Sequence, residues 1–363
     1  RGLGDVYKRQ AQKLIDFAKI LVGRIPGGLA HTNILGNTLF GSLSGSSVAA
    51  SVAIGGVLIP MEEKEGYDKK FAAAVNIASA PTGLIIPPSG ILIIYPVLAG
   101  CSVVGMIMSG YIPGLMWALA CMVVAYVIAK KNHYPTAGKV PASVFFKYFV
   151  DAIPSLLLIV IIVGGVMSGI FTATESAAVA VAYTLFLSIV VYRSIKIKDL
   201  PKILLDACET TAVIMFLIAG SNVMSFVMSF TGLPSAIGNA LISVSSNKYV
   251  ILLIINLVLL VVGCFMDITP AVLIFTPIFL PVVQSFGMDP IHFGIMMVMN
   301  LGIGNITPPV GSALFSGCSV ADMDMEDMIK PILPFYAAIF VALMLVAYVP
   351  WFSMALPTLF GAV

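Results

Sequence analysis

Apolar runs long enough to cross a lipid bilayer recur along this chain, and no other feature of the sequence limits its fold as strongly. Together with their flanks, these runs fall at 115–129, 153–170, 177–191 and 332–349. A helix that spans a bilayer needs about 20 apolar residues. Because the runs are continuous and do not alternate with a period of two, they favour helices over the strands of a membrane barrel. The sequence therefore predicts an all-α polytopic membrane protein.

The composition agrees with a membrane protein and gives no support to an enzyme. The chain is 60% hydrophobic and 10% charged, whereas soluble domains carry about 25% charged residues. Its net charge of +2 carries no nucleic-acid signal, and it has none of the HExxH, GxSxG and GxxxxGK[ST] patterns. The five cysteines are scattered singly in apolar surroundings, which predicts small core residues: Cys101, Cys121, Cys208, Cys264 and Cys318.

Two apolar stretches are interrupted by a Pro-Pro pair that lies between glycines. GLIIPPSG occupies 83–90 and GNITPPVG occupies 304–311. Proline lacks the backbone N–H and disfavours helix at the residue before it, so each pair breaks a helix. Such a break is either a kink that shapes packing or an unwound segment that lines a transport site. Two breaks in register favour the transport site.

The two breaks belong to a wider internal repeat. A shift of 221 residues (304 minus 83) superposes one Pro-Pro pair on the other without a gap. The same shift matches Pro60 with Pro281, Gly66 with Gly287, Asp68 with Asp289, and Pro113 with Pro334. Since Pro and Gly set the shape of the backbone, the chain is predicted to hold two structurally related halves.

The predicted elements follow these halves. Residues 1–10 fit neither half and are predicted to be non-native. The first half, 11–139, is expected to hold an amphipathic helix at 11–25, a re-entrant hairpin at 27–60, a broken span at 71–99 and a span at 105–129. The second half, 140–363, is expected to hold spans at 153–170, 173–192 and 203–230, a short helix at 233–246, a hairpin at 249–281, a broken span at 291–317 and a last span at 332–356. The first half is the shorter one, so we expect that the chain lacks its first spans and does not transport alone.

The placement of charge predicts how the halves lie in the membrane. When the first hairpin enters from the cytoplasm, all but one of the 19 Lys and Arg residues fall on the cytoplasmic side, as the positive-inside rule requires. The exception is Lys248. This arrangement puts an odd number of crossings between the hairpins. The repeat is therefore predicted to be inverted, with the hairpins entering from opposite faces.

Each hairpin carries polar residues at its expected tip. Ser44, Ser46 and Ser47 lie between arms too short to span, where hydroxyls can cap a helix or bind a cation. Small-residue packing between helices is the alternative. The shift of 221 aligns Asp267 with Ser46. A carboxylate in an apolar stretch indicates a functional group, but Asp267 ahead of Pro270 also fits a helix N-cap.

Two further polar residues are predicted to be structural. Glu175 follows Thr172 and Thr174 in a pattern typical of a capped helix start. His292 follows the sequence MDP and is expected at the start of a helix rather than in a proton relay.

Four stretches of the chain resemble one family of transporters. They are NTLFGSLSGSSVAASVAIGGVLIPMEEKEGYDKKFAAAVNIASAPTGLIIPPSG, GGVMSGIFTATESAAVAVAYTLF, FMDITPAVLIFTPIFLPVVQSFGMDPIHFGIMM and NLGIGNITPPVGSALF. In their order and spacing they are similar to the large membrane subunit of tripartite ATP-independent periplasmic (TRAP) transporters. The resemblance covers the chain from about residue 12 onward.

This resemblance implies an elevator-type secondary transporter in a bacterial inner membrane, coupled to a Na⁺ gradient. It also implies two partners: a small membrane subunit, and a periplasmic binding protein that delivers an organic acid such as a C4-dicarboxylate or a sialic acid. Two departures from the family are the missing first spans and the lack of an arginine near either break. A stand-alone divalent-anion/Na⁺ symporter of related fold is the alternative, and an ion channel or membrane scaffold is a weaker one.

By position, the resemblance implies two cation regions with a substrate site between them. The first region consists of Ser44, Ser46, Ser47, Thr82, Gly83 and Pro87, and the second of Asp267, Thr269, Gly304, Asn305 and Thr307. The substrate is expected between the hairpin tips, near Ser46, Pro88, Ser89, Thr269, Pro308 and Pro309. Na⁺ is expected as the coupling ion, with no other metal and no cofactor.

Overall fold

The computed structural model describes residues 2–136, 150, 153–154, 156–193, 195–245 and 247–362. All regular structure within these residues is helical. Among the described residues, six helices are long and apolar enough to cross a membrane, or up to seven when a bent pair counts as one span. The prediction of an all-α polytopic membrane protein is confirmed.

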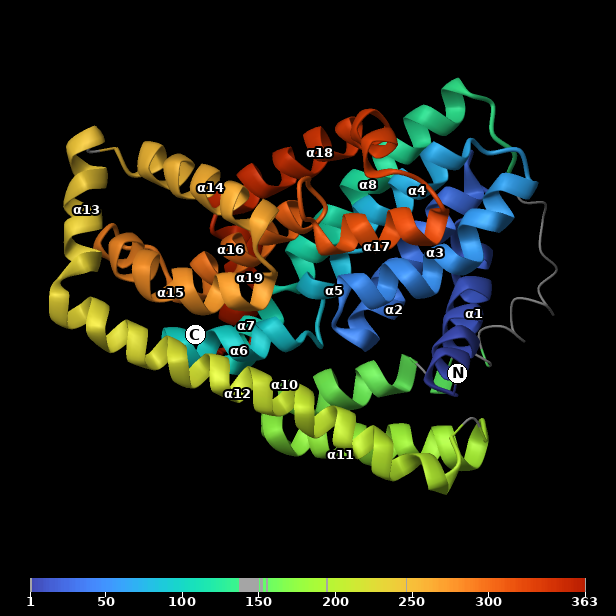
Figure 1. Ribbon diagram of the computed structural model, residues 1–363, viewed down its shortest axis with the longest axis horizontal. Helices are drawn as coiled ribbons and strands as arrows, with labels where there is room; N and C mark the ends of the chain where they lie inside the picture. The colour runs from blue at the N-terminus through green and yellow to red at the C-terminus, as the bar shows by residue number, and fades with distance from the viewer. Residues whose placement is uncertain are drawn as a thin grey trace.

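The first repeat extends from α1 to α8 (Figure 1). Its helices are α1 (Gly2–Val22), α2 (Gly28–Ser44), α3 (Ser47–Lys64), α4 (Lys69–Ser79), α5 (Thr82–Ile85), α6 (Gly90–Ala99), α7 (Val103–Ser109) and α8 (Tyr111–Lys131). Residues 2–10, which were predicted to be non-native, form the start of α1.

The predicted second half is 140–363, and the part of it that the shift of 221 residues matches to the first half, called here the second repeat, occupies the C-terminal part of the chain. Its helices are α13 (Leu233–Val244), α14 (Lys248–Phe265), α15 (Ile268–Ser285), α16 (Pro290–Asn305), α17 (Ser312–Ala321), α18 (Met325–Tyr348) and α19 (Trp351–Leu359). Between the repeats lie η1 (Val160–Gly164), α10 (Gly165–Met167), α11 (Ala173–Phe186), η2 (Leu187–Val191), η3 (Ile197–Asp199) and α12 (Leu200–Thr231).

Two helical hairpins enter the molecule from opposite ends, as Figure 1 shows. The blue pair α2 and α3 comes from the right of the view, and the orange pair α14 and α15 comes from the left, so their turns lie near the middle. The first turn consists of Gly45 and Ser46, and the second of Met266 and Asp267. Gly45 has a φ of 62°, which glycine adopts without steric cost. Both turns lie where the sequence predicts the hairpin tips.

Each hairpin is covered by the broken span of the other repeat. The first broken span consists of α4, α5 and α6 and bends by 47° at its break. Its last part, α6, packs against α15 of the second hairpin. The second broken span consists of α16 and α17, and α17 packs against α3 of the first hairpin. The two repeats therefore exchange one helix each.

Paired glycines let the first arm of each hairpin approach the broken span of its own repeat. A Cβ atom on Gly41 of α2 would stand 2.5 Å from the Cα of Gly83 in α5. In the second repeat, a Cβ atom on Gly304 of α16 would stand 2.4 Å from the Cα of Gly263 in α14. Neither crossing has room for a larger side chain. The glycines thus bring the backbone of each hairpin next to a break.

The helices α10, α11 and α12 form a separate layer below the hairpins in Figure 1, which we call the outer layer. It meets the second hairpin where α12 packs against α15, and there Ser221 Oγ donates a hydrogen bond to the carbonyl of Leu273 (2.5 Å). It also approaches α1, where Lys13 Nζ lies 4.4 Å from the ring centre of Tyr192. Much of α12 faces outward, and Phe216 and Phe230 on it are 80% and 85% exposed. An apolar surface of this kind is suited to lipid or to another membrane protein.

Two sequence expectations are wrong in detail. The last predicted span, 332–356, is divided, because α18 ends at Tyr348 and α19 begins at Trp351 after Pro350. Proline has no N–H to continue the helical hydrogen bonds. Cys208 is exposed rather than packed in the core, since α12 turns most of its surface outward. The other four cysteines are buried or half-buried.

The structural interpretation of Glu175 is confirmed. Thr172 Oγ1 accepts a hydrogen bond from the backbone N of Glu175 (3.3 Å), and the Glu175 carboxylate accepts one from the backbone N of Thr172 (2.8 Å). This reciprocal capping box begins α11 and pairs two backbone donors that the helix itself leaves free.

The glycine crossings can be tested by the substitution Gly304→Ala. We expect this added methyl group to force α14 and α16 apart and to destabilise the protein by about 1–3 kcal/mol, as overpacking does elsewhere. Thermal unfolding of the purified protein in detergent should show a lower melting temperature. Gly220→Ala on α12 is the matched control, because a Cβ atom at Gly220 meets nothing within 4 Å. Equal melting temperatures for the two variants would show that the close approach is not required.

Candidate functional site

The tip of the first hairpin is closed by its own serines. Ser46 begins α3 as its N-cap, and its Oγ accepts a hydrogen bond from the backbone N of Ala49 (3.3 Å). Ser44 Oγ lies 3.4 Å from the carbonyl oxygens of Gly41 and Ser46. Both serines are half-buried. The hydroxyl groups and carbonyls of this tip thus form a compact set of oxygen atoms, in which the carbonyls of Gly41 and Ser46 also accept from the backbone N of Gly45 and Ala50.

The first break lies beside this tip. A Cβ atom on Gly45 would stand 3.5 Å from the backbone N of Gly90 and 3.7 Å from the carbonyl oxygen of Pro88. The peptide bond between Pro87 and Pro88 is cis, as is that between Pro308 and Pro309. Ser89 is 1% exposed, and its Oγ has no hydrogen-bond partner among the described residues. A buried hydroxyl without a partner at the break is available to a bound ligand.

The tip of the second hairpin carries Asp267. This residue takes the N-cap position of α15, yet its side chain makes no capping hydrogen bond. Its exposed carboxylate instead lies 3.4 Å from Ser312 Oγ, at the start of α17. The second break is joined to the hairpin through its backbone, since the N–H of Val310 donates to the carbonyl of Cys264 (3.2 Å). The carboxylate therefore faces the second break and does not accept a hydrogen bond from the start of α15.

One line of polar side chains joins the two tips through the second break. Asn305 Nδ2 donates a hydrogen bond to Ser47 Oγ (2.7 Å), and both residues are 3% exposed. Asn305 Oδ1 accepts hydrogen bonds from Ser312 Oγ and from the backbone N of Ala313 (3.4 Å). Since Ser312 also reaches Asp267, the line extends from Ser47 in the first tip to Asp267 in the second.

Four helix N-termini lie at the tips and breaks. They are those of α3 and α15 at the tips and of α6 and α17 at the breaks. The free backbone N–H groups and the aligned peptide dipoles make a helix N-terminus favourable to negative charge. Two broken spans and two hairpins therefore bring positive helix ends toward the middle of the molecule from both sides.

The other predicted site residues are placed less directly. Thr82 is buried and donates to the carbonyl of Ser79 (2.7 Å), and Thr307 donates to that of Ile303 (2.6 Å). Gly83 and Gly304 are the glycines of the helix crossings. Pro87 is buried, Thr269 and Pro308 are half-buried, and Pro309 is exposed. The structure thus groups the predicted residues around the tips and breaks. Hydrogen bonds pair Ser44 with Ser46 and Gly304 with Thr307, and the link between the two tips consists of Ser47, Asn305 and Asp267, with Ser312 between the last two.

Buried asparagines next to the site are absent from the sequence prediction. In the first repeat, Asn37 Nδ2 on α2 donates to Asn76 Oδ1 on α4 (3.0 Å) and to Ser79 Oγ (2.9 Å). In the second, Asn300 Nδ2 on α16 donates to Asn256 Oδ1 on α14 (2.6 Å). Each bridge fastens a hairpin arm to its broken span. The isolated asparagines in otherwise apolar stretches are the signal that could have identified them.

The chemistry available at the site is that of oxygen atoms. Among the described residues, no group of three or more His, Cys, Asp and Glu side chains could hold a metal ion. Hydroxyl, amide and carbonyl oxygens with one carboxylate suit a hard cation that is weakly held. Positive helix ends suit an anion at the same place. The arrangement can therefore bind a cation and an anion side by side.

Comparison with known proteins identifies one family. The family model of the tripartite ATP-independent periplasmic transporter, DctM component, matches residues 8–352. The protein YgiK of Salmonella typhimurium is 51% identical over 97% of this chain and 81% of its own length. The C4-dicarboxylate TRAP transporter large permease protein DctM of Pseudomonas aeruginosa is 38% identical over 97% of this chain and 82% of its own. The sialic acid TRAP transporter large permease protein SiaM of Vibrio cholerae is 38% identical over 96% and 82%.

The line between the tips can be tested by Asn305→Ala. This change leaves the buried hydroxyl of Ser47 and the half-buried hydroxyl of Ser312 without their amide partner, which we expect to cost about 1–3 kcal/mol. The melting temperature should fall, and amide hydrogen exchange should rise in peptides that contain either tip. Asn132→Ala removes an exposed amide at the end of α8 and is the control. Unaltered exchange at both tips in Asn305→Ala would contradict the linkage.

Proposed function

Since the chain belongs to the DctM component family of tripartite ATP-independent periplasmic transporters, we propose that it carries an organic anion between its two hairpin tips, driven by Na⁺. The chain is a large permease-type membrane subunit of this family and not an enzyme. The observation that carries the proposal is the meeting of two tips, two breaks and four helix N-termini in one place. Paired breaks in inverted halves are the arrangement in which secondary transporters bind their ions and substrates.

Na⁺ is proposed to bind in two regions. The first comprises Ser44, Ser46, Ser47, Thr82, Gly83 and Pro87, and the second Asp267, Thr269, Gly304, Asn305 and Thr307. This assignment is supported by the oxygen atoms of the first tip and by the carboxylate of Asp267, which makes no capping hydrogen bond. A bound cation lowers the cost of bringing an anion into the site. By linkage, the anion strengthens cation binding by the same factor.

The substrate is proposed to be a carboxylate-bearing organic acid. Two of the relatives named above, DctM and SiaM, are permease proteins of C4-dicarboxylate and sialic acid TRAP transporters, and these substrates share a carboxylate. The unpartnered hydroxyl of Ser89 and the N-termini of α6 and α17 offer donors to such a group. Ser46, Pro88, Thr269, Pro308 and Pro309 are the other residues proposed to surround it.

Two partners complete the proposed transporter. Membership of the family implies a small membrane subunit and a soluble protein that binds the acid in the periplasm. The exposed apolar face of α12 supports the first, because it offers a contact surface within the membrane. The bacterial inner membrane is the proposed location.

The outer layer supports an elevator mechanism. In this mechanism the two hairpins and broken spans move together past a fixed layer and carry the site across the membrane. The outer layer meets the second hairpin along α12 and α15, and the pocket between these helices is lined mainly by apolar side chains such as Leu217, Met224 and Ile274. Apolar contacts have no fixed direction, so one helix can slide past the other without breaking a polar network. Ser221 with Leu273 and Lys13 with Tyr192 are polar contacts that would change during the movement.

Na⁺ coupling can be tested with Ser46→Ala and Thr307→Ala in the full-length complex, reconstituted in liposomes with the small subunit and the binding protein. Each change removes one cation ligand, and a contact with a charged group is worth about 1.5–3 kcal/mol. We therefore expect the Na⁺ concentration for half-maximal uptake to rise about tenfold or more. Ser243→Ala is the control, since Ser243 is exposed on α13.

Unchanged Na⁺ activation in both variants would remove these two residues from the cation sites. Uptake that proceeds equally well without the binding protein would favour a stand-alone symporter instead.

Movement between the layers can be tested with the pair Ser221→Cys and Leu273→Cys. A short bifunctional thiol reagent should join α12 to α15, since the side chain of Ser221 contacts the backbone of Leu273. The reagent should be one that bonds to each cysteine through a disulfide. We expect the bridge to abolish uptake, and a reductant, which cleaves these disulfides, to restore it. Each single cysteine variant, treated in the same way, should keep its activity. Full uptake by the bridged protein would exclude an elevator movement between these helices.

A further inference from the structure

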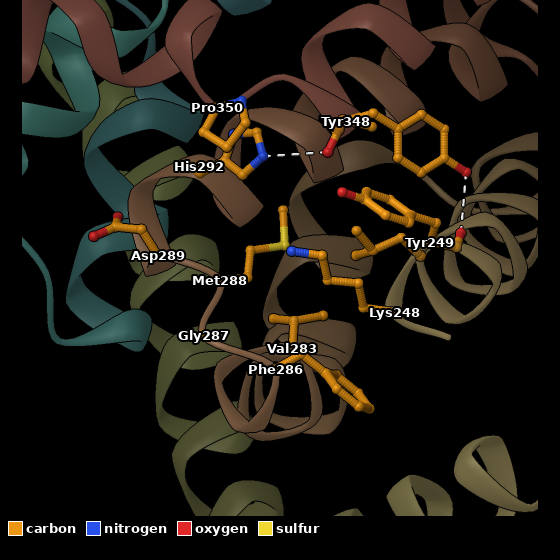
Figure 2. A pocket seen from close by; sticks show the side chains of 12 residues that line it. Lys248, Tyr249, Val283, Phe286, Gly287, Met288, Asp289, His292, Tyr348 and Pro350 are labelled. Carbon is orange, nitrogen blue, oxygen red and sulfur yellow. Dashed lines mark hydrogen bonds between the residues drawn. The ribbon is translucent and has the colours of Figure 1, made fainter. Parts of the chain in front are cut away.

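A pocket of about 240 Å³ lies at the base of the second hairpin, at the end of the molecule away from the tips. It is formed where α14 and α16 begin and where α15 and α18 end. Figure 2 shows Asp289 on one side of this pocket and Lys248 reaching in from the other, with His292 and Tyr348 above them. No residue of the proposed transport site lines it.

The internal repeat indicates that this pocket is not a by-product of the fold. The shift of 221 residues places Met288 and His292 of the pocket on Tyr67 and Phe71 of the first repeat. There the ring of Tyr67 stacks on that of Tyr134 at 4.5 Å, and the ring of Phe71 lies 5.4 Å from the same tyrosine. Aromatic rings thus fill in the first repeat the space that stays open in the second.

The pocket carries one group of each charge. Lys248 is the first residue of α14, and its Nζ lies 5.1 Å from the ring centre of Tyr249. The helix N-terminus and the lysine both favour a negative group. Asp289 Oδ1 caps α16 by accepting from the backbone N of Ile291 (2.7 Å), which leaves Oδ2 outside the cap. The recess is therefore complementary to a molecule with an anionic and a cationic end.

His292 does not supply a free polar group to the pocket. Its Nδ1 lies 2.6 Å from Ser353 Oγ, and its Nε2 lies 3.2 Å from the carbonyl oxygen of Ala347. Both ring nitrogens are engaged with the end of α18 and the start of α19. The histidine forms part of the wall of the pocket. The charged groups of the pocket are Lys248 and Asp289.

Apolar surface extends from the pocket along two helices. On α14, Val250, Leu253, Leu257 and Val261 are exposed, three or four residues apart. On α18, Val341 and Leu345 are exposed, and Val349, directly after the helix, continues the same spacing of four residues. Tyr249 and Tyr348, which meet at a ring distance of 5.8 Å, stand where the two stripes reach the pocket. Tyrosine at such a boundary is typical of the interface between lipid tails and headgroups.

We propose that this pocket binds the headgroup of a zwitterionic phospholipid with a primary ammonium group, that is, a phosphatidylethanolamine. The phosphate lies at Lys248 and the N-terminus of α14, and the ammonium donates to Asp289. The acyl chains run along the stripes of α14 and α18. Such a lipid would anchor the base of the second hairpin in the bilayer while the tip of the hairpin binds the substrate.

The proposal can be tested by counting bound lipids on the purified full chain with native mass spectrometry. Short-chain phosphatidylethanolamine, phosphatidylglycerol and phosphatidylcholine are the probes. We expect the first phosphatidylethanolamine to bind about fivefold more tightly than the other two, because only it presents both a phosphate and an ammonium that can donate hydrogen bonds.

Two substitutions separate the contributions of the two charges. Lys248→Gln should weaken phosphatidylethanolamine and phosphatidylglycerol alike, because both have the phosphate. Asp289→Asn should weaken only phosphatidylethanolamine, about fivefold, and so remove its preference. Asparagine also caps helices well, so the start of α16 is kept. Lys202→Gln, at an exposed lysine of α12, is the control and should change nothing.

Three results would overturn the proposal. A preference for phosphatidylethanolamine that persists in both pocket variants would place the lipid elsewhere. Tighter binding of phosphatidylglycerol, improved by Asp289→Asn, would show a site for anions alone. Equal affinity for soluble glycerophosphoethanolamine would show a site for a small molecule, since a lipid gains further from its acyl chains.

Discussion

Inside a bilayer, each backbone N–H or C=O group without a partner costs several kcal/mol, and two interrupted helices create many such groups. Other parts of this structure supply hydrogen-bond partners for such groups. The N–H of Val310 pairs with the second hairpin, the indole of Trp117 donates to the carbonyl of Ala78 (2.8 Å), and the hydroxyl of Tyr336 donates to that of Ile306. The second hairpin supplies the first of these partners, and α8 and α18 supply the other two. At the first break, the buried hydroxyl of Ser89 has no hydrogen-bond partner among the described residues.

How much the sequence predicts depends on how directly a residue sets the backbone. The breaks at 86–89 and 306–311 follow from the Pro-Pro pairs, since proline removes a donor, and the first hairpin turn follows from Gly45, since glycine permits a positive φ. The role of Asn305 does not follow in the same way. Its partner Ser47 is 258 positions away, and nothing local distinguishes it from an asparagine that packs against a neighbouring helix. The division of the last span could have been predicted from the sequence, because Pro350 lies inside the predicted range 332–356.

The two repeats share a backbone plan but not their chemistry. Equivalent positions hold Ser46 and Asp267 at the tips, so one turn offers a hydroxyl and the other a carboxylate. Asn305 reaches across to Ser47, whereas the positions that match these two by the shift of 221 are Leu84 and Ile268, which cannot form that hydrogen bond. At the hairpin bases, stacked rings in one repeat correspond to an open pocket in the other. The two repeats give the molecule two similar hairpin tips, and these substitutions make the tips chemically different.

The exchange of helices between the repeats bears on how the protein is made. α3 emerges from the ribosome long before α17, the helix that covers it, and α6 likewise precedes its partner α15. A chain inserted from its N-terminus must hold the first hairpin, with its glycine-lined crossing and buried Asn37, in the membrane until residues 312–321 arrive. The packing around the first hairpin is therefore completed only near the end of synthesis, when α17 follows α16 out of the ribosome.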